Sequence, residues 1–208
     1  LLDHPDADPA VVCESLRHIA RANWWFGGWW AVRRGLSTLL ADRPSAPVTV
    51  VDIGCGSADL LCRAVRWASR RGMRLVPIGL ERHRAAAALA QRAAVPTLLA
   101  AAPDLPFRDR SVDLVIASQL LHHFTPETIV ATCRAADRVA RRGVIVADLR
   151  RSSVAVTGFR VGSRLLRFDP VTRADGVTSV RRGFSEGELE ALTRRAGVRA
   201  RVVRSPGF

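Results

Sequence analysis

A turn early in the chain contains two glycines and has an acid on either side. The turn is Gly54-Cys55-Gly56, with Asp52 just before it and Asp59 just after it. Val48–Ile53, which precedes the turn, has the composition of a buried strand, and a helix is expected to begin after it. Glycines let a ligand approach the backbone closely, and a helix N-terminus offers unpaired N–H groups. The pattern therefore predicts a ligand site, although a short Gly-x-Gly also suits a plain tight turn.

A further acid, Glu81, follows the second predicted strand, Leu75–Leu80. The carboxyl ends of neighbouring parallel strands meet at one edge of a sheet, so Glu81 is expected beside the glycine turn. A carboxylate at that position can accept hydrogen bonds from both hydroxyls of a ribose. The two strands together favour a ligand that carries a ribose.

The elements that must position these residues alternate along the chain. From Val48 onward, short β-branched runs alternate with helical segments, the order that builds a parallel sheet covered by helices on both faces. We predict an α/β fold with a doubly wound, Rossmann-like, mostly parallel sheet. Its strands are expected at 48–53, 75–80, 97–100, 112–117, 144–147 and 199–204.

Two of the helices have clear start signals. Thr125-Pro126 supplies an N-cap and a first-turn proline for a helix to about Arg142, with the glycine after it as the stop. Ser185 and Glu188 form a capping box that opens a second helix, expected at 186–196 and ended by a glycine.

Residues 1–47 form a helical extension, expected to act as a lid over the open edge of the sheet and broken at Gly27-Gly28. It carries four of the five tryptophans, at positions 24, 25, 29 and 30. Helix geometry cannot turn all four inward, so some must line a cavity, pack on a partner or stay exposed. Packing against the main domain and roofing a pocket are both compatible with the pattern.

Three blocks, in this order, resemble a known family. They are Val51-Asp52-Ile53-Gly54-Cys55-Gly56, then Leu105-Pro106-Phe107 leading through Asp109 to Ser111–Val115, and last Leu121-His122-His123-Phe124. Over residues 48 to 204 the chain resembles the class I S-adenosylmethionine-dependent methyltransferases, and within them those similar to the ubiquinone and menaquinone biosynthesis methyltransferases. A dinucleotide dehydrogenase would normally show a third glycine and lack the later two blocks. The resemblance implies a methyltransferase with S-adenosylmethionine as its cofactor.

On this interpretation residues 48–208 are the S-adenosylmethionine-binding methyltransferase domain. Within it, 152–183 is expected to be a substrate-side insertion, because segments after a strand's carboxyl end build specificity in such folds. The insertion has a predicted helix at 154–168, a break at Asp169-Pro170 and a turn at Asp175-Gly176.

The resemblance also implies roles for single residues. Gly54 and Gly56 would pass their backbone along the methionine part of the cofactor, with Asp52 supporting that loop. Glu81 would hold the ribose. Asp59 would reach the cofactor's amino group, or would serve only as a helix-dipole carboxylate. The complete expected cofactor set is Asp52, Gly54, Cys55, Gly56, Asp59, Glu81, Asp104, Leu105 and Ser118.

The adenine end departs from the family pattern. Leu105 and its neighbours would border the adenine, while Ser118 would lie near the methionine part. Relatives usually carry an aspartate four residues before the Leu-Pro-Phe block, where it binds the adenine amino group; that position is Ala101 here, and Asp104 is out of register. Losing one charge-assisted hydrogen bond costs about 1.5–3 kcal/mol, which predicts weakened cofactor binding unless Asp104 or a backbone carbonyl compensates.

Methyl transfer from a sulfonium is an in-line displacement, so the protein must align the nucleophile and, where that nucleophile is a hydroxyl, remove its proton. His122 and His123 follow the fourth strand at the edge where ligands bind, and one of them is the candidate base. The same pair accompanies many substrates in the relatives, so it can instead shape the cofactor loop.

The expected substrate-binding residues come from both ends of the site. Asp148 and Arg150 follow the fifth strand at the same edge, where an arginine could pair with a carboxylate or polarise a phenolate. Trp25 and Trp29 are added from the lid. No metal site is expected.

Composition limits the partners. The 208 residues carry a formal net charge of +13, but the 32 basic residues are all arginine and are scattered along the chain. Arg63, Arg66 and Arg70, for example, recur at the spacing of a solvated helix face. Nucleic acid is therefore not the expected partner. Apolar runs are too short to cross a bilayer, the acidic start is unlike an export signal, and the four cysteines lack a C-x-x-C pair. A cytoplasmic protein with reduced cysteines is expected, and its oligomeric state is left open.

The leading hypothesis is methyl transfer to an oxygen, or with less support a carbon, of a small aromatic or polyketide-like molecule. The alternatives are an RNA or protein methyltransferase, suggested by the charge, and a cofactor-binding cyclase or partner protein that no longer methylates, suggested by Ala101. Relatives also have a seventh, antiparallel strand between the fifth and sixth. The sequence therefore predicts a chain that extends beyond Phe208, or a symmetry mate or rearrangement that covers the gap.

Overall fold

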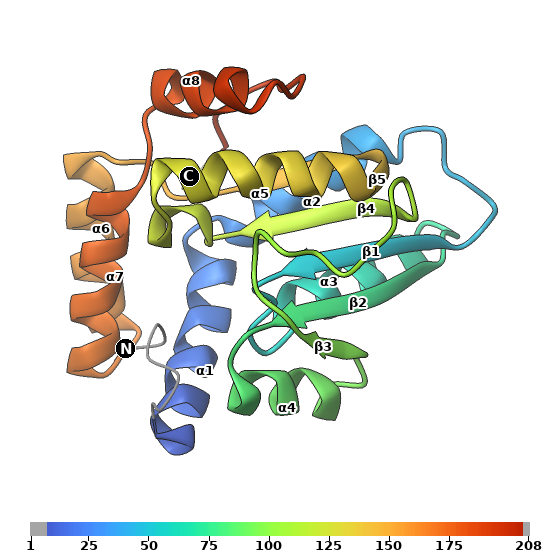
Figure 1. Cartoon of the computed structure of the whole chain (residues 1–208). Coiled ribbons are helices and arrows are strands. Elements are labelled where there is room, and N and C mark those ends of the chain that lie inside the picture. Colours follow the sequence, from blue (N-terminus) through green and yellow to red (C-terminus); the bar gives the residue numbers. More distant parts are fainter. Residues whose placement is uncertain (1–7, 206–208) are drawn as a thin grey trace.

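The computed structural model describes residues 8–205 (Figure 1), so the acidic residues at the start of the chain and Phe208 at its end lie outside the described part. Five parallel strands form one sheet in the order β3-β2-β1-β4-β5. The strands are β1 (Val48–Ile53), β2 (Leu75–Glu81), β3 (Thr97–Leu99), β4 (Val112–Ser118) and β5 (Ala140–Ala147). The helices are α1 (Pro9–Trp25), α2 (Gly28–Leu39), α3 (Asp59–Ser69), α4 (Arg84–Arg92), the short η1 (Leu121–His123), α5 (Pro126–Val139), α6 (Ser153–Leu165), α7 (Pro170–Arg182) and α8 (Glu186–Ala196).

The chain order switches direction at β1, the central strand. It runs outward through β2 and β3, then returns to place β4 and β5 on the other side of β1. Ile53 lies opposite Leu80 of β2 and Ala117 of β4, so the carboxyl ends of these three strands meet. Ligands bind at such a switch point in open α/β sheets. The predicted doubly wound, Rossmann-like fold is confirmed.

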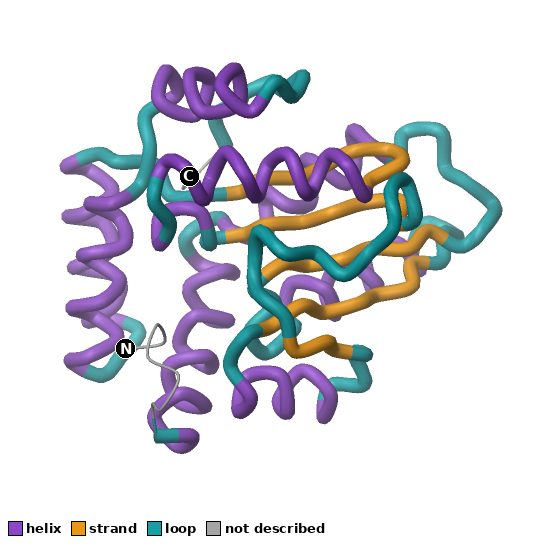
Figure 2. Tube along the Cα trace, viewed as in Figure 1, coloured by secondary structure: helices purple, strands orange, loops and turns teal. Residues whose placement is uncertain are grey.

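Successive side chains along each strand point to opposite faces of the sheet, and each face packs into its own hydrophobic core. Val50 and Leu114 belong to a cluster with α2 and α3, while Val51 and Val115 face α5. Helices thus cover both faces, and Figure 2 shows them on either side of the strands. The predicted N-terminal helices are present, and α2 packs on the outer strand β5, with Gly35 close against Ile145.

The helix predicted to run to Arg142 ends earlier, at Val139, and β5 begins at Ala140. Gly143 is therefore not a helix stop. It lies inside β5, where the pairing of β4 and β5 shifts register between Val112 and Leu114. A glycine in a strand often marks such an irregularity.

The strand predicted at 199–204 is wrong, because residues 198–205 form neither strand nor helix. Among the described residues β5 pairs only with β4, so its outer edge has no strand partner and this segment does not join it. It is held by side chains instead. Arg204 forms two hydrogen bonds with Glu186, at 2.5 and 3.0 Å, and its carbonyl oxygen accepts one from Arg34 at 2.9 Å.

The turn predicted at Asp175-Gly176 is also wrong, since α7 runs unbroken through it. Asp169 caps α7 by accepting from the Thr172 N–H at 2.9 Å, so the predicted break is a helix start. Gly176 lets α6 and α7 pack closely, because a Cβ there would lie 2.2 Å from the Phe159 ring. The helical hairpin α6–α7 stands with α1 beyond the arrowheads of the strands (Figure 1).

No helix within residues 8–205 has the length and hydropathy that a bilayer-spanning segment needs.

Candidate active site

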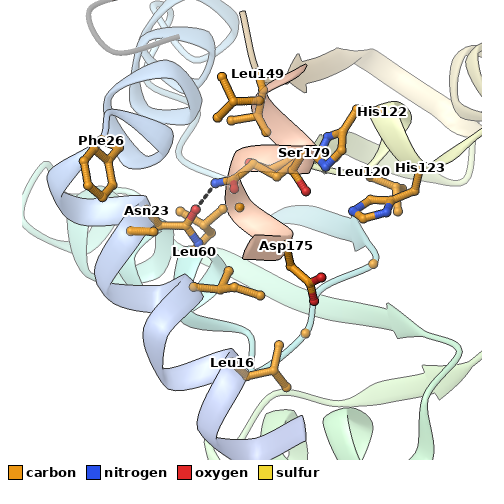
Figure 3. Close-up of a pocket in the computed structure, with 18 of the residues that line it drawn as sticks. Leu16, Asn23, Phe26, Leu60, Leu120, His122, His123, Leu149, Asp175 and Ser179 are labelled. Atoms are coloured by element: carbon orange, nitrogen blue, oxygen red, sulfur yellow. Dashed lines mark hydrogen bonds between the residues drawn. The ribbon is translucent and has the colours of Figure 1, made fainter. Parts of the chain in front are cut away.

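A cavity of about 1090 Å³ lies at the carboxyl edge of the sheet. Its floor is the loop between β1 and α3 together with the ends of β2 and β4, and its walls come from α1, α6 and α7. Figure 3 shows Leu16 and Asn23 of α1, the two histidines of η1, and Asp175 and Ser179 of α7 around the cavity. Eleven of the predicted site residues line it: Trp25, Asp52, Gly54, Cys55, Gly56, Asp59, Glu81, Ser118, His122, His123 and Arg150.

The glycine loop is fastened to β2 by backbone and side-chain bonds. The N–H groups of Gly54 and Cys55 both donate to the Leu80 carbonyl, at 2.8 and 3.0 Å, and the Gly56 N–H donates to Glu81 Oε2 at 2.9 Å. Gly54 and Gly56 have φ values of +70° and +54°, which glycine adopts without strain. Buried Glu81 also accepts the His83 N–H at 2.9 Å. It therefore holds the loop, a role that the sequence did not indicate.

Three carboxylates line this end of the cavity. Burial raises the pKa of Asp52 well above its ordinary value, and the nearby Asp59 and Glu81 charges raise it further. Burial also raises the pKa of Asp59, although hydrogen bonds from Asn23 and the Arg63 charge oppose the shift. Asp52 Oδ1 is buried and finds no hydrogen-bond partner within residues 8–205. This end of the cavity suits a positively charged ligand.

Asn23 of α1 was not foreseen as a site residue. It is the single asparagine of the chain, is buried, and lines the cavity. Its Nδ2 donates to both Asp59 oxygens, at 3.3 and 3.2 Å, and its Oδ1 accepts from Gln119, as Figure 3 shows. Gly28 allows this contact, because a Cβ there would lie 2.7 Å from Asn23 Oδ1. An isolated amide in an otherwise apolar stretch was the available signal.

His122 and Asp148 form a buried pair. His122 Nδ1 lies 2.6 Å from Asp148 Oδ1, and the two side chains are 2% and 0% exposed. The Asp148 carboxylate also accepts the N–H groups of Leu121 and Leu149, both at 2.7 Å. Asp148 does not line the cavity, whereas His122 does. The other ring nitrogen of His122, Nε2, is buried and has no partner in the described chain.

The second histidine differs from the first. His123 is exposed and packs against the His122 ring, with centroids 4.1 Å apart. Both rings lie at the cavity in Figure 3. Ser118 Oγ is a further buried atom on the cavity wall that lacks a partner in the part of the chain described.

Three other predicted residues stand off the main cavity. Leu105 is buried in the core on the α5 face, and Asp104 beside it is exposed. The wall where the adenine was expected is formed by Ala100, Ala101 and Ala102. Trp29 of α2 is buried in the core, while Trp25 of α1 lines the cavity and stays 64% exposed. The tryptophan cluster is thus divided between core packing and the cavity wall.

Part of the cavity wall is aromatic and contains Phe26, Phe159 and Phe168. Phe26 and Phe159 have ring centroids 5.2 Å apart. His18 of α1 contacts this part of the chain, since its Nδ1 lies 2.8 Å from Asp169 Oδ2 and its ring stacks on Phe168 at 4.9 Å. Within residues 8–205 no group of three histidines, cysteines or acids is placed to hold a metal ion.

Comparison with known proteins gives one matching family model. A family model described as a methyltransferase domain matches residues 51–147, which include the glycine loop, Glu81 and the two histidines. A search of curated proteins gives no significant match.

Solved structures share the fold at low sequence identity. Magnesium protoporphyrin IX methyltransferase from Synechocystis PCC 6803, solved with bound S-adenosylhomocysteine, is 18% identical, and the alignment covers 82% of this chain and 73% of that one with a TM-score of 0.56. A protein from Methanococcus maripaludis, described as an S-adenosylmethionine-dependent methyltransferase, is 11% identical over 88% and 81% of the two chains, with a TM-score of 0.58. A third structure concerns the conversion of a disulfide bond into a thioacetal group during echinomycin biosynthesis; it is 20% identical over 74% and 64%, with a TM-score of 0.52. Residues 51–147 thus match a methyltransferase domain, and the chain shares its fold with solved structures of S-adenosylmethionine-dependent methyltransferases.

Proposed function

We propose that this protein is an S-adenosylmethionine-dependent methyltransferase that acts on an oxygen, or with less support a carbon, of a small aromatic or polyketide-like molecule. The observation that carries the proposal is the state of His122. Its Nε2 is buried on the cavity wall without a partner, while Asp148 holds its Nδ1 at 2.6 Å. A histidine held in this way is ready to take a proton from a ligand hydroxyl.

The residues at the acidic end fit S-adenosylmethionine. Its sulfonium and ammonium groups are cations, and Asp52, Asp59 and Glu81 supply negative charge at this end of the cavity. When bound, the cofactor supplies an electrophilic methyl carbon. We propose that Gly54 and Gly56 lie along its methionine part and that Asp59 binds its amino group. Glu81 can still accept from a ribose, because each carboxylate oxygen has a second lone pair beyond its backbone bond.

The adenine would lie against the alanine wall of residues 100–102. No carboxylate stands in that wall, and the exposed Asp104 lies outside the cavity. The proposed contacts of Asp104 and Leu105 with the adenine would therefore need a loop movement. Backbone groups of the wall are the available partners for the adenine amino group.

In the proposed mechanism the protein positions and deprotonates the acceptor. His122 Nε2 accepts the hydroxyl proton, which raises the nucleophilicity of the oxygen as it is aligned for attack. Asp148 keeps the proton of the ring on Nδ1, so that Nε2 is free to accept, and its charge stabilises the imidazolium that results. Walls from α1, α6 and α7 limit access of water to the reacting groups.

The flanking segments have proposed roles too. We propose that residues 1–47 contribute the lid, through Asn23, Trp25 and Phe26 of α1, and that 152–183 is the substrate-side insertion. The proposed kinship with the ubiquinone and menaquinone group is supported by Leu121-His122-His123-Phe124, since these residues form η1 at the cavity.

The test combines cofactor binding with turnover. Calorimetric titration with S-adenosylmethionine and S-adenosylhomocysteine is expected to give micromolar binding that is lost in Glu81→Ala. Glu81 also fastens the glycine loop, so Asp59→Asn serves as the milder companion variant, with folding checked by circular dichroism. Phenolic acceptors are then screened for methylated products. His122→Asn should abolish methylation while keeping cofactor affinity; equal activity in that variant would contradict the role of His122, and absence of cofactor binding by the folded wild type would refute the proposal.

A further inference from the structure

Two arginines that are far apart in the sequence, Arg150 and Arg182, line the same cavity. Arg150 follows β5, and Arg182 ends α7; both are exposed and both line the cavity. The backbones beside them are bonded to one another. The Phe184 N–H donates to the Leu149 carbonyl at 2.8 Å, and the Arg151 N–H donates to the Phe184 carbonyl at 3.1 Å.

A glycine makes this approach close. A Cβ at Gly183 would lie 2.3 Å from the Leu149 carbonyl oxygen, so a larger residue would push the two segments apart. The backbone segments that carry Arg150 and Arg182 are therefore held near one another. Two guanidinium groups that reach into one cavity from neighbouring segments would repel each other unless an anion lay between them.

Neither guanidinium has an acidic partner within residues 8–205. The arginines next to them in the sequence, Arg151 and Arg181, lie differently. Arg151 pairs with Glu188 at 2.5 Å and lies outside the cavity wall, and Arg181 is exposed but does not line the cavity. Asp175 of α7 does line the cavity, but its carboxylate already has an interaction of its own.

Groups of both signs line the cavity. Asp52, Asp59 and Glu81 come from the ends of β1 and β2 and the start of α3, whereas Arg150 and Arg182 come from the segment after β5 and the end of α7. His122, whose Nε2 is unpaired within the described residues, lines the same cavity, as do Phe26, Phe159 and Phe168. An acceptor that fits all of these features has an aromatic body with a hydroxyl at one end and an anionic group at the other.

We propose that Arg150 and Arg182 form an anion clamp that binds a carboxylate of the acceptor, so that the substrate is a hydroxyaryl acid. This inference rests on the proposed function, because it assigns the acceptor end of the same cavity. The clamp holds the acid, the phenylalanines hold the ring, and the hydroxyl reaches His122. Arginine binds carboxylates through paired N–H donors, which fixes orientation as well as affinity.

The experiment measures binding of acid and ester pairs to the protein saturated with S-adenosylhomocysteine, so that no turnover occurs. The probes are para-hydroxybenzoic acid and a hydroxynaphthoic acid, each beside its methyl ester. Wild type is expected to bind an acid at least about tenfold more tightly than its ester, the ratio that one charge-assisted contact gives. The preference should shrink as salt is added, because the clamp is exposed.

Arg150→Met and Arg182→Met should each remove most of this preference while leaving the Kd of the ester unchanged. Methionine keeps an unbranched stem without the charge. Arg181→Met is the matched control, since it removes a neighbouring charge that is off the cavity, and it should keep the preference.

The outcomes separate this inference from the proposed function. A protein that binds S-adenosylhomocysteine but prefers neither acid overturns the clamp alone. The same holds if Arg181→Met lowers the preference as much as Arg182→Met does, because the effect would then be general electrostatics. Wild type that does not bind S-adenosylhomocysteine overturns the proposed function and the clamp with it.

Discussion

Replacing Asp148 by asparagine tests the link between the buried pair and catalysis. Oδ2 of Asp148 accepts the Leu121 N–H, and Oδ1 accepts both the Leu149 N–H and His122 Nδ1. An amide has one oxygen in place of two, so its NH₂ group must face one of these donors in either orientation. A buried donor left without an acceptor costs about 1–3 kcal/mol. We therefore expect Tm to fall by roughly 2–12 °C.

The effect on the reaction should be larger than the effect on folding. Without the carboxylate, His122 loses the partner that fixes its tautomer and stabilises its charged form. General-base catalysis contributes about 10²–10⁴-fold, so the methyl-transfer rate in a single turnover should fall by roughly 10²-fold or more. The Kd of S-adenosylhomocysteine should stay within about twofold, because Asp148 does not line the cavity.

Single-turnover quench kinetics, thermal melting and calorimetry on the same preparations check these three expectations. Asp104→Asn is the control, since it makes the same chemical change at an exposed position off the cavity, and it should alter none of them. A folded Asp148→Asn variant that keeps more than about a tenth of the wild-type single-turnover rate would refute the assignment of His122 as an oriented base.

Three further predictions address the cofactor end and the fold. Asn23→Leu removes the amide that holds Asp59, so the Kd of S-adenosylhomocysteine should rise about tenfold by calorimetry, whereas methylthioadenosine, which lacks the amino acid part, should bind unchanged. Burial raises the pKa of Asp59, so its charge is lost at a higher pH than that of an ordinary aspartate; affinity for S-adenosylmethionine should begin to fall above the ordinary aspartate range in wild type and stay nearly flat in Asp59→Asn. The Ser185 N–H and the Arg151 guanidinium lower the pKa of Glu188 to about 2, which stabilises the fold above the unfolded pKa of about 4.3 and is lost as pH falls toward 2. Glu188→Gln should therefore lower Tm by about 2–4 °C at pH 7, with a smaller difference near pH 3 in melting experiments.

The parts of the fold that the sequence predicts well are those with local causes. Val48–Ile53 is a strand from end to end because its β-branched run is buried on both faces. The Ser185 capping box opens α8 as expected, and Gly197 closes it with a φ of 69°. Thr125 likewise caps α5. Each of these signals is complete within a few residues, so no distant contact is needed to interpret it.

The errors have non-local causes. Asp175-Gly176 looks like a turn, but packing of Gly176 against Phe159 keeps it inside α7. The segment 199–204 has strand composition, yet a strand forms only where the fold pairs it with a neighbour, and composition does not report that pairing. Tertiary context decides both positions.

The candidate site divides in the same way. The sequence places Gly54, Gly56 and Glu81 together because they follow two neighbouring parallel strands, whose carboxyl ends meet at one edge of the sheet. Asn23 is missed, since only the folded chain brings α1 beside Asp59. Asp148 was placed with the substrate, whereas the structure sets it behind His122, a distinction of side-chain direction that a sequence does not carry.

The division of the cavity between a central module and its two flanks bears on how such enzymes diverge. The segment that matches the methyltransferase domain, 51–147, supplies the acidic end and His122, while α1 and residues 149–182 supply most of the aromatic and arginine-bearing walls. On the proposed function, mutations in the flanks can therefore exchange one acceptor for another without disturbing the residues proposed to bind the cofactor. Descendants of one ancestor would then keep a recognisable middle and lose resemblance at both ends. Transplanting residues 8–39 together with 149–182 between two such enzymes is the natural way to exchange their acceptors.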